Sequence, residues 1–198
     1  MARGKKPLLE NIEIKKIAAE GKSIAYVDEK VLFVPNTVPG DIVDVQVTRK
    51  RKSFLEGFIV NVRKYSDIRT EPFCSHFGIC GGCKWQNLPY QLQTEFKQQE
   101  IIDNLQRIGK VELQNVSPII GSPKTTYYRN KLEYTFCNKR FLTREEIANG
   151  QDIDRTPAVG FHVPGLFDKV IYIEKCICRP NLQMAFVTLF GSTLSNMN

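Results

Sequence analysis

The stretch of sequence that decides the fold lies at residues 42–62 and reads IVDVQVTRKRKSFLEGFIVNV. Valine occupies every second position from residue 43 to residue 47, and apolar residues occupy every second position from 58 to 62. A two-residue period is typical of strands that bury one face and expose the other. The polar run between the two halves indicates a turn, so the stretch predicts two antiparallel strands joined as a hairpin.

Three further short strands are expected before this hairpin. Apolar residues alternate with polar ones around residues 12–14 and 24–26, and a third apolar run, at residues 31–34, ends at Pro35. Turn-forming residues separate the runs, as in Pro39-Gly40-Asp41. Five strands between residues 8 and 65 predict a small all-β barrel of the OB type, because closure removes exposed strand edges.

The turn inside the hairpin is strongly basic. It carries Arg49, Lys50, Arg51 and Lys52 in succession, followed by the aromatic Phe54. Four cations beside an aromatic ring suit contact with an RNA backbone and a stacked base, so these five residues are predicted to bind RNA. The alternative is a solvated turn in which Phe54 is simply the first core residue of the next strand.

The distribution of charge supports a polyanionic partner. The chain of 198 residues has a formal net charge of +7, and residues 1–70 hold 14 Lys/Arg against 9 Asp/Glu. Basic surfaces attract nucleic acid through the release of counterions from phosphates. No run of eighteen apolar residues suits a membrane span, and no apolar signal-peptide core follows the basic residues 3–6. These features predict a cytoplasmic protein with reduced thiols.

The second half of the sequence mixes helix and strand patterns. A helix is expected to begin near Pro89 and to stop at Gly109, and its apolar stripe is interpreted as core packing. Strand patterns follow at residues 131–136, 158–162 and 170–173, whereas the polar residues 144–155 suggest a surface loop. The stripe consists of Leu92, Phe96, Ile101, Leu105 and Ile108.

Three of the six cysteines fall within ten residues, in the pattern C-x5-C-G-G-C at Cys74, Cys80 and Cys83. The two glycines allow the backbone to wrap closely around a bound group, and thiolates favour zinc or an iron–sulfur cluster. The spacing does not choose between the two. A fourth ligand is expected, and the candidates are Cys176, Cys178, Cys137 and His76. His76 stands too close to Cys74 to reach the same metal easily, and Cys137 suits a small packing residue.

These motifs together resemble the bacterial 23S rRNA uracil-5 methyltransferases that carry a [4Fe–4S] cluster. The resemblance rests on the cysteine pattern at residues 74–83 and the sequence LPYQ at 88–91. It also rests on YYRNKLEY at 127–134, and on GFH at 160–162 followed by VIYIEKC at 170–176. The barrel at 8–65 is similar to the TRAM domain, a small RNA-binding barrel. The resemblance implies a [4Fe–4S] cluster held by Cys74, Cys80, Cys83 and Cys176, with Cys178 as a neighbour.

The resemblance also implies a domain organisation. A basic N-terminus at residues 1–7 precedes a TRAM-type barrel at 8–66, then an incomplete α+β domain at 67–182 with the cluster, and an atypical tail at 183–198. Within the central domain, Arg129 and Lys131 would face RNA, although a structural salt bridge is an alternative role for them.

The chain departs from the family in one respect. Its members transfer a methyl group from S-adenosylmethionine with a C-terminal Rossmann-like domain, which supplies a cysteine nucleophile for the uracil. No such domain is visible in this sequence, so the expectation is an RNA-binding and iron–sulfur portion that transfers no methyl group alone. Two alternatives stay open: a stand-alone RNA-binding module, and a zinc-stabilised ribosome-associated protein.

Overall fold

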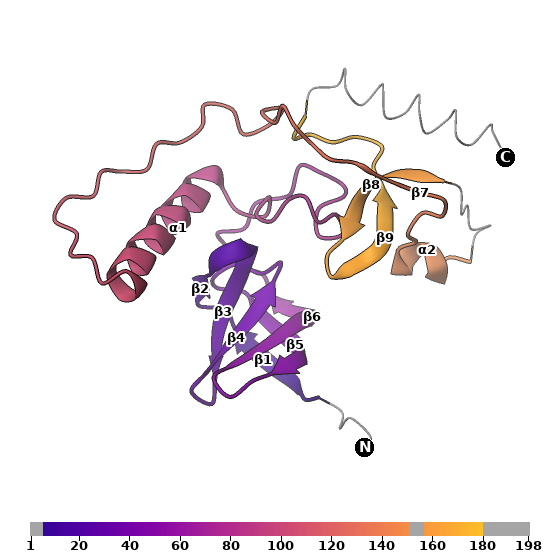
Figure 1. Cartoon of the computed structure of the whole chain (residues 1–198). Coiled ribbons are helices and arrows are strands. Elements are labelled where there is room, and N and C mark those ends of the chain that lie inside the picture. Colours follow the sequence, from indigo (N-terminus) through magenta and orange to yellow (C-terminus); the bar gives the residue numbers. More distant parts are fainter. Residues whose placement is uncertain (1–5, 151–156, 180–198) are drawn as a thin grey trace. The chain divides into compact units, whose positions relative to one another are not determined.

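The computed structural model describes residues 6–150 and 157–179. The chain folds into two compact units that alternate along the sequence (Figure 1). Among the described residues, the first unit comprises 6–72 and 84–121, and the second comprises 73–83, 122–150 and 157–179. The cysteine pattern therefore joins the second unit, whereas the residues on either side of it join the first. The expected tail at 183–198 lies outside the described residues.

The first unit is built on a curled six-stranded sheet in the order β1-β5-β6-β4-β3-β2. β1 and β2 form the two edges of the sheet, although they are consecutive in the sequence and only Ile14 and Lys15 lie between them in the chain. The pairings are antiparallel except for β4 with β6, which is parallel. The elements are β1 (Leu8–Glu13), β2 (Lys16–Ile17), a 3-10 turn (Ala19–Gly21), β3 (Lys22–Val27), β4 (Lys30–Pro35), β5 (Ile42–Lys50) and β6 (Phe54–Lys64).

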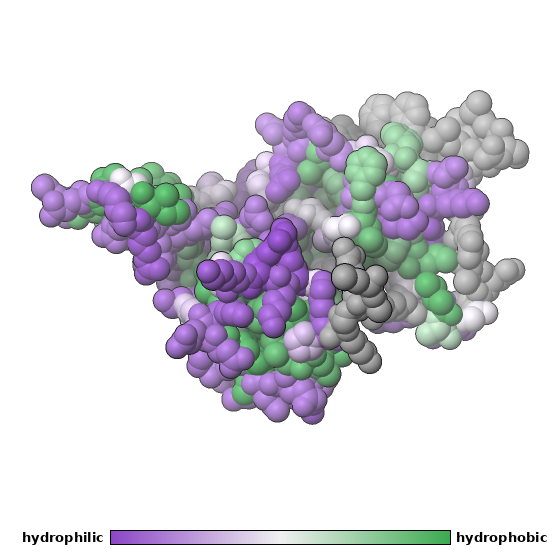
Figure 2. Space-filling view, turned by 60° about the horizontal axis from the view of Figure 1, so that its bottom comes forward, coloured by the Kyte–Doolittle hydropathy of each residue, from purple (hydrophilic) through white to green (hydrophobic). Residues whose placement is uncertain are grey.

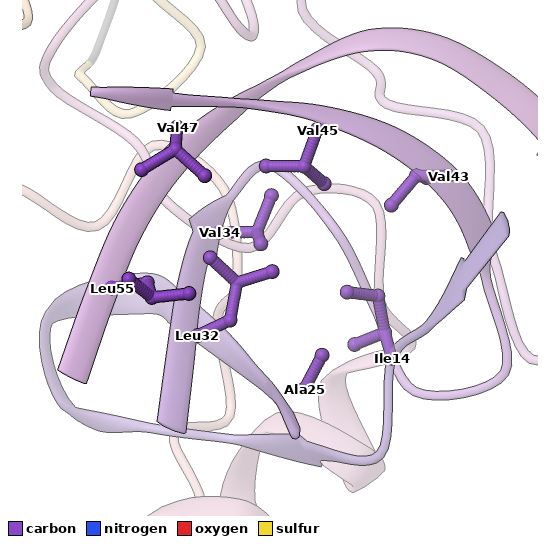
Figure 3. Close-up of a cluster of buried hydrophobic side chains, with 8 residues drawn as sticks. All are labelled: Ile14, Ala25, Leu32, Val34, Val43, Val45, Val47 and Leu55. Carbon is purple, nitrogen blue, oxygen red and sulfur yellow. The ribbon is translucent and has the colours of Figure 1, made fainter. Parts of the chain in front are cut away.

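The core of this sheet consists of the alternating apolar residues that predicted it. Figure 3 shows eight buried side chains that point toward one another from the surrounding strands. Burying a Val or Leu side chain stabilises a fold by about 1.5–3 kcal/mol, so this cluster holds the sheet in its curled form. The prediction of a small OB-like β fold is confirmed as a curled half-barrel. The eight residues are Ile14, Ala25, Leu32, Val34, Val43, Val45, Val47 and Leu55.

A buried ion pair fastens the chain after β6 back onto the sheet. The Asp41 carboxylate is fully buried and accepts two bonds from Arg69, at 2.8 Å from Nε and 2.7 Å from Nη2. It also accepts from the backbone N–H groups of Val38, at 2.8 Å, and Ser66, at 3.0 Å. With four donors the carboxylate is fully satisfied, which is the condition under which a buried charge is tolerated.

The helical part of the first unit differs from the prediction. α1 (Tyr90–Asp103) continues into a π-helical turn, η2 (Asn104–Ile108), and neither contains a buried residue. Ile101 is 58% exposed and Ile108 is 79% exposed, so the interpretation of the apolar stripe as core packing is wrong for its C-terminal part. The spacing predicted the helix, but it could not predict whether another element packs against the apolar stripe. Figure 2 shows hydrophilic and hydrophobic residues mixed along the helix. No described helix is long and apolar enough to cross a membrane.

The second unit contains a three-stranded antiparallel sheet in the order β7-β8-β9. Its strands are β7 (Thr135–Cys137), β8 (Ala158–Val163) and β9 (Leu166–Tyr172). β8 and β9 confirm two of the expected strands, whereas β7 begins four residues later than the predicted strand at 131–136.

The expected surface loop at residues 144–155 contains a helix instead. α2 (Arg144–Ala148) begins after Thr143, whose side chain accepts from the Glu146 N–H while Glu146 reaches back to the Thr143 N–H. This reciprocal capping box satisfies two otherwise unpartnered amide groups and starts the helix. The prediction of a loop missed the Thr-x-x-Glu signal. Residues 151–156 of the same segment lie outside the described part of the chain.

Candidate functional site

The basic hairpin tip lies where β5 meets β6. The N–H of Arg51 donates to the carbonyl of Phe54 at 2.9 Å and closes the turn. Arg49, Lys50, Arg51 and Lys52 are all exposed, so four cationic side chains surround a short, hydrogen-bonded turn. Such a tip presents positive charge to a polyanion with little loss of backbone freedom.

Two of the five residues at the tip that are predicted to bind RNA are also engaged within the sheet. The Arg49 guanidinium lies 3.4 Å from the Glu56 carboxylate and 5.9 Å from the centre of the Phe54 ring. Phe54 is half-buried and packs edge-on against Phe33, with their ring centres 5.9 Å apart. Arg49 and Phe54 are therefore partly structural. Lys50, Arg51 and Lys52 are exposed at the tip, and Lys50 is the last residue of β5.

The cysteine loop of the second unit is tightly wound. The carbonyl of His76 accepts from the N–H of Cys80 at 2.9 Å, and the N–H of Gly82 donates to the Cys80 sulfur at 3.4 Å. The N–H of Gly81 donates to the carbonyl of His162 in β8 at 3.2 Å. A Cβ on Gly81 would lie 2.8 Å from that carbonyl oxygen, so the close approach of loop and strand requires glycine there.

The C-x-C segment that follows β9 brings two more thiols to this loop. The sulfur of Cys83 lies 3.3 Å from that of Cys178, across 95 residues of sequence. Cys80 and Cys176 both pack against the buried pair Ile171 and Ile173. All six cysteines belong to the second unit, and the C-x-C segment brings Cys176 and Cys178 to the loop that carries the other three of this group. Cys178, which the resemblance implied only as a neighbour of the ligands, contacts Cys83, and spacing could not predict this contact.

The thiols influence one another's protonation. Burial is the main cause that raises the pKa of Cys74 and of Cys80, and the nearby Cys83 and Cys176 raise both further. The Cys178 thiol donates a hydrogen bond to Cys176, which lowers the pKa of Cys176 to about 6 and raises that of Cys178. Mutual charge effects of this kind require proximity, and they link Cys176 to the three-cysteine loop.

Within residues 6–150 and 157–179, no three histidine, cysteine or acidic side chains are placed to hold one metal ion. His76 Nδ1 stands 4.0 Å from the Cys74 sulfur, and Cys137 contacts the carbonyl of Ala158 at 3.5 Å. The cluster and its ligand set of Cys74, Cys80, Cys83 and Cys176 stay a prediction.

The stretch that contains Arg129 and Lys131 runs beside the C-x-C segment. The N–H groups of Tyr127 and Arg129 donate to the carbonyls of Ile177, at 2.8 Å, and Cys178, at 2.9 Å. Arg129 also donates from Nε to the Tyr128 hydroxyl at 3.4 Å, which raises the pKa of the guanidinium. This backbone pairing places a basic residue next to the gathered cysteines.

Lys131 is highly exposed. Its ammonium lies 3.0 Å from the carboxylate of Glu133, and the two side chains are 79% and 82% exposed. Surface pairs of this kind are worth little, at most about 1 kcal/mol, and they exchange readily for other partners. The geometry therefore permits either role expected for Lys131, and its contact with RNA stays a prediction.

Comparison with known proteins identifies the barrel and the relatives of the chain. Residues 10–60 match the model of the TRAM domain. A protein of Bacteroides thetaiotaomicron named "Uncharacterized RNA methyltransferase" is 56% identical over 160 residues, which cover 81% of this chain and 35% of that protein. A Francisella tularensis subsp. novicida protein named "23S rRNA (uracil(1939)-C(5))-methyltransferase RlmD" is 37% identical over 173 residues, covering 83% of this chain and 38% of that protein.

A solved structure shares the fold. It is the crystal structure of Pyrococcus abyssi tRNA (uracil-54, C5)-methyltransferase in complex with S-adenosyl-L-homocysteine. The likeness covers 92% of this chain and 36% of that one, with a TM-score of 0.52 and 22% sequence identity. At that identity the likeness concerns the fold alone. The chain spans little more than a third of the length of the relatives described above.

Proposed function

This chain is homologous to proteins named as RNA methyltransferases and carries a TRAM domain, and we propose that it is the RNA-binding part of an enzyme that forms 5-methyluridine in 23S rRNA. The observation that carries the proposal is the exposed basic tip on a curled half-barrel that matches the TRAM domain. The identity of the RNA rests on the printed name of the Francisella relative. The methyl donor would be S-adenosylmethionine, as suggested by the S-adenosyl-L-homocysteine in the Pyrococcus abyssi structure.

The basic tip would supply the electrostatic part of RNA binding. Each Lys or Arg that neutralises a phosphate releases counterions, which makes affinity depend on salt with a slope of about 0.7 per contact for a single strand. Lys50 and Lys52 offer two such contacts from one short turn. Arg49, held against Glu56 and Phe54, would fix the direction of the tip more than it adds affinity.

The test compares two double variants with the same change of charge. Lys50→Ser/Lys52→Ser removes two cations from the tip, whereas Lys110→Ser/Lys124→Ser removes two exposed cations elsewhere. We expect the tip variant to bind a single-stranded fragment of 23S rRNA with a salt slope reduced by about 1.4, measured by fluorescence anisotropy from low to moderate salt. The control should keep the wild-type slope. Equal slopes for both variants would remove the tip from the RNA-binding surface.

We also propose that Cys74, Cys80, Cys83 and Cys176 hold a [4Fe–4S] cluster. The donor chemistry supports this, because four thiolates are the usual ligands of such a cluster and these cysteines gather in one unit. Each thiolate of a cubane binds a different iron, so its ligands stand further apart than those around one ion. Bound there, the cluster would cross-link the cysteine loop to the segment after β9.

Metal analysis decides the identity of the bound group. Protein purified without oxygen should be brown and contain about four irons per chain. One zinc ion in a colourless protein would instead favour a zinc-stabilised module and would leave the RNA-binding role of the barrel untouched. The chain alone is expected to transfer no methyl group, which incubation with radiolabelled S-adenosylmethionine and rRNA checks. A cytoplasmic location stays a prediction from the sequence.

A further inference from the structure

The hairpin formed by β8 and β9 presents an aromatic pair at the surface of the second unit. Phe167 is 91% exposed although it lies within a strand. Its ring is stacked against that of His162, with centres 5.7 Å apart and an angle of 7° between the planes. Single exposed apolar residues are ordinary, but a nearly fully exposed ring held parallel to a second ring is an organised surface.

The backbone of the hairpin explains how this pair is held. Val163 pairs with Leu166 across Pro164 and Gly165, and Gly165 has a φ of +78° that suits glycine. Proline followed by such a glycine is the pattern of a type II turn, which restricts both central residues. The hairpin therefore turns at a fixed place and offers its rings at a low cost in conformational entropy.

A β-bulge directs the Phe167 ring. His162 pairs with Val170 and the next residue of β8 pairs with Leu166, so residues 167–169 of β9 have no partner residue on β8. Bulges bend a strand and re-aim its side chains. Here the bulge turns Phe167 onto His162 and away from the apolar cluster around Ile171.

The His162 ring is fixed from its other side as well. Its Nε2 lies 3.1 Å from the hydroxyl oxygen of Thr135 in β7, and the two share a hydrogen bond. The stacked pair is therefore tied to all three strands of the sheet. Gly160 pairs with both Thr135 and Tyr172, which puts the 42% exposed Tyr172 on the same face as His162.

We propose that His162 and Phe167 form a stacking platform for an unpaired RNA base, an inference that rests on the proposed function. Unpaired bases are read by stacking on aromatic side chains, which needs an exposed ring with one face open. A basic residue that could contact RNA phosphates lies near the aromatic pair in sequence. Lys131 precedes Thr135, the hydrogen-bond partner of His162, by four residues, or at most about 14 Å of extended chain. The two rings would stack on a base while Lys131 and Arg129 contact phosphates of the RNA backbone.

The experiment measures binding of a single-stranded RNA oligonucleotide and of the matching duplex to the whole chain. Phe167→Ala should bind the single strand about tenfold more weakly, with an unchanged salt slope, because stacking rather than charge is lost. Phe167→Trp should retain the affinity, and its added fluorescence should be quenched by the single strand. Leu166→Ala, a neighbouring exposed apolar residue, serves as the matched control and should bind like the wild type.

Each outcome has a distinct meaning. If Phe167→Ala binds as tightly as the wild type while Lys50→Ser/Lys52→Ser binds more weakly, the platform is wrong and the proposed function stands. If the wild-type chain binds no RNA, both fail. A loss of affinity shared by Phe167→Ala and Leu166→Ala would also overturn the platform, because it would indicate a general apolar contact rather than stacking. Thermal unfolding of the variants should match the wild type, since the ring buries little surface.

Discussion

The two units of this chain achieve their stability by different means. The curled sheet encloses a cluster of eight buried apolar residues, whereas the buried cluster of the second unit has two, Ile171 and Ile173. Ala158, Val159 and Val170 are also buried in its sheet. Cys80 and Cys176 pack against that small cluster, and the same unit contains an irregular connection at residues 122–134. The difference teaches that the first unit can fold by hydrophobic burial alone, while the second relies on links between distant segments.

Removing one thiol should have the largest effect, because it tests whether the second unit depends on links between its cysteines while the first unit does not. We expect Cys83→Ser to abolish iron binding and to increase hydrogen exchange in residues 122–150 and 157–179, while residues 8–64 stay protected. The physical reason is that a bound cluster would close a long loop that the small apolar cluster cannot close alone. Iron content and exchange measured by mass spectrometry provide the test.

Cys137→Ser is the control for this prediction. Cys137 lies on β7, contacts the Ala158 carbonyl and is not among the proposed ligands. The Cys137→Ser variant should keep its iron and the wild-type pattern of hydrogen-exchange protection. Wild-type thermal stability and RNA binding in Cys83→Ser would show that the thiols do not hold the second unit together.

A second prediction sharpens the contrast within the first unit. Leu32 is fully buried in the sheet, so Leu32→Ala should lower the free energy of unfolding by about 2–5 kcal/mol through the lost transfer energy and the cavity. Ile108 is 79% exposed, and Ile108→Ala should change stability by no more than about 0.5 kcal/mol. Urea unfolding of both variants measures the difference. A large loss in Ile108→Ala would mean that the helical stripe is covered in solution.

The smallest expected effect concerns the reactivity of one thiol as pH changes. In metal-free protein the Cys178 thiol lowers the pKa of Cys176 to about 6, so Cys176 should become a reactive thiolate as pH rises through 6. Cys80, whose pKa is raised mainly by burial, should react only at higher pH than an ordinary cysteine. Iodoacetamide labelling followed by peptide sequencing gives both profiles. Cys178→Ala should move the Cys176 profile to higher pH, and an unmoved profile would contradict the hydrogen bond.

Much of the first unit could be predicted because strand patterns are local. The two-residue alternation around Val45 specified which side chains face inward, and burial of one face then determines register. The basic tip followed from the same pattern, since the turn between two strands is exposed. The apolar stripe of α1 misled for the opposite reason: helical spacing records which residues share a face, not whether another element covers it.

In the second unit the sequence by itself predicts a thiolate site, whereas the tertiary structure decided which thiols are neighbours. Three cysteines within ten residues indicated a thiolate site, because few other roles need that spacing. Two contacts, of Cys83 with Cys178 and of Gly81 with His162, join segments about 80–95 residues apart. The bulge next to Phe167 alters the register of β8 and β9. Such long-range pairings depend on how two elements pack, which no local pattern encodes.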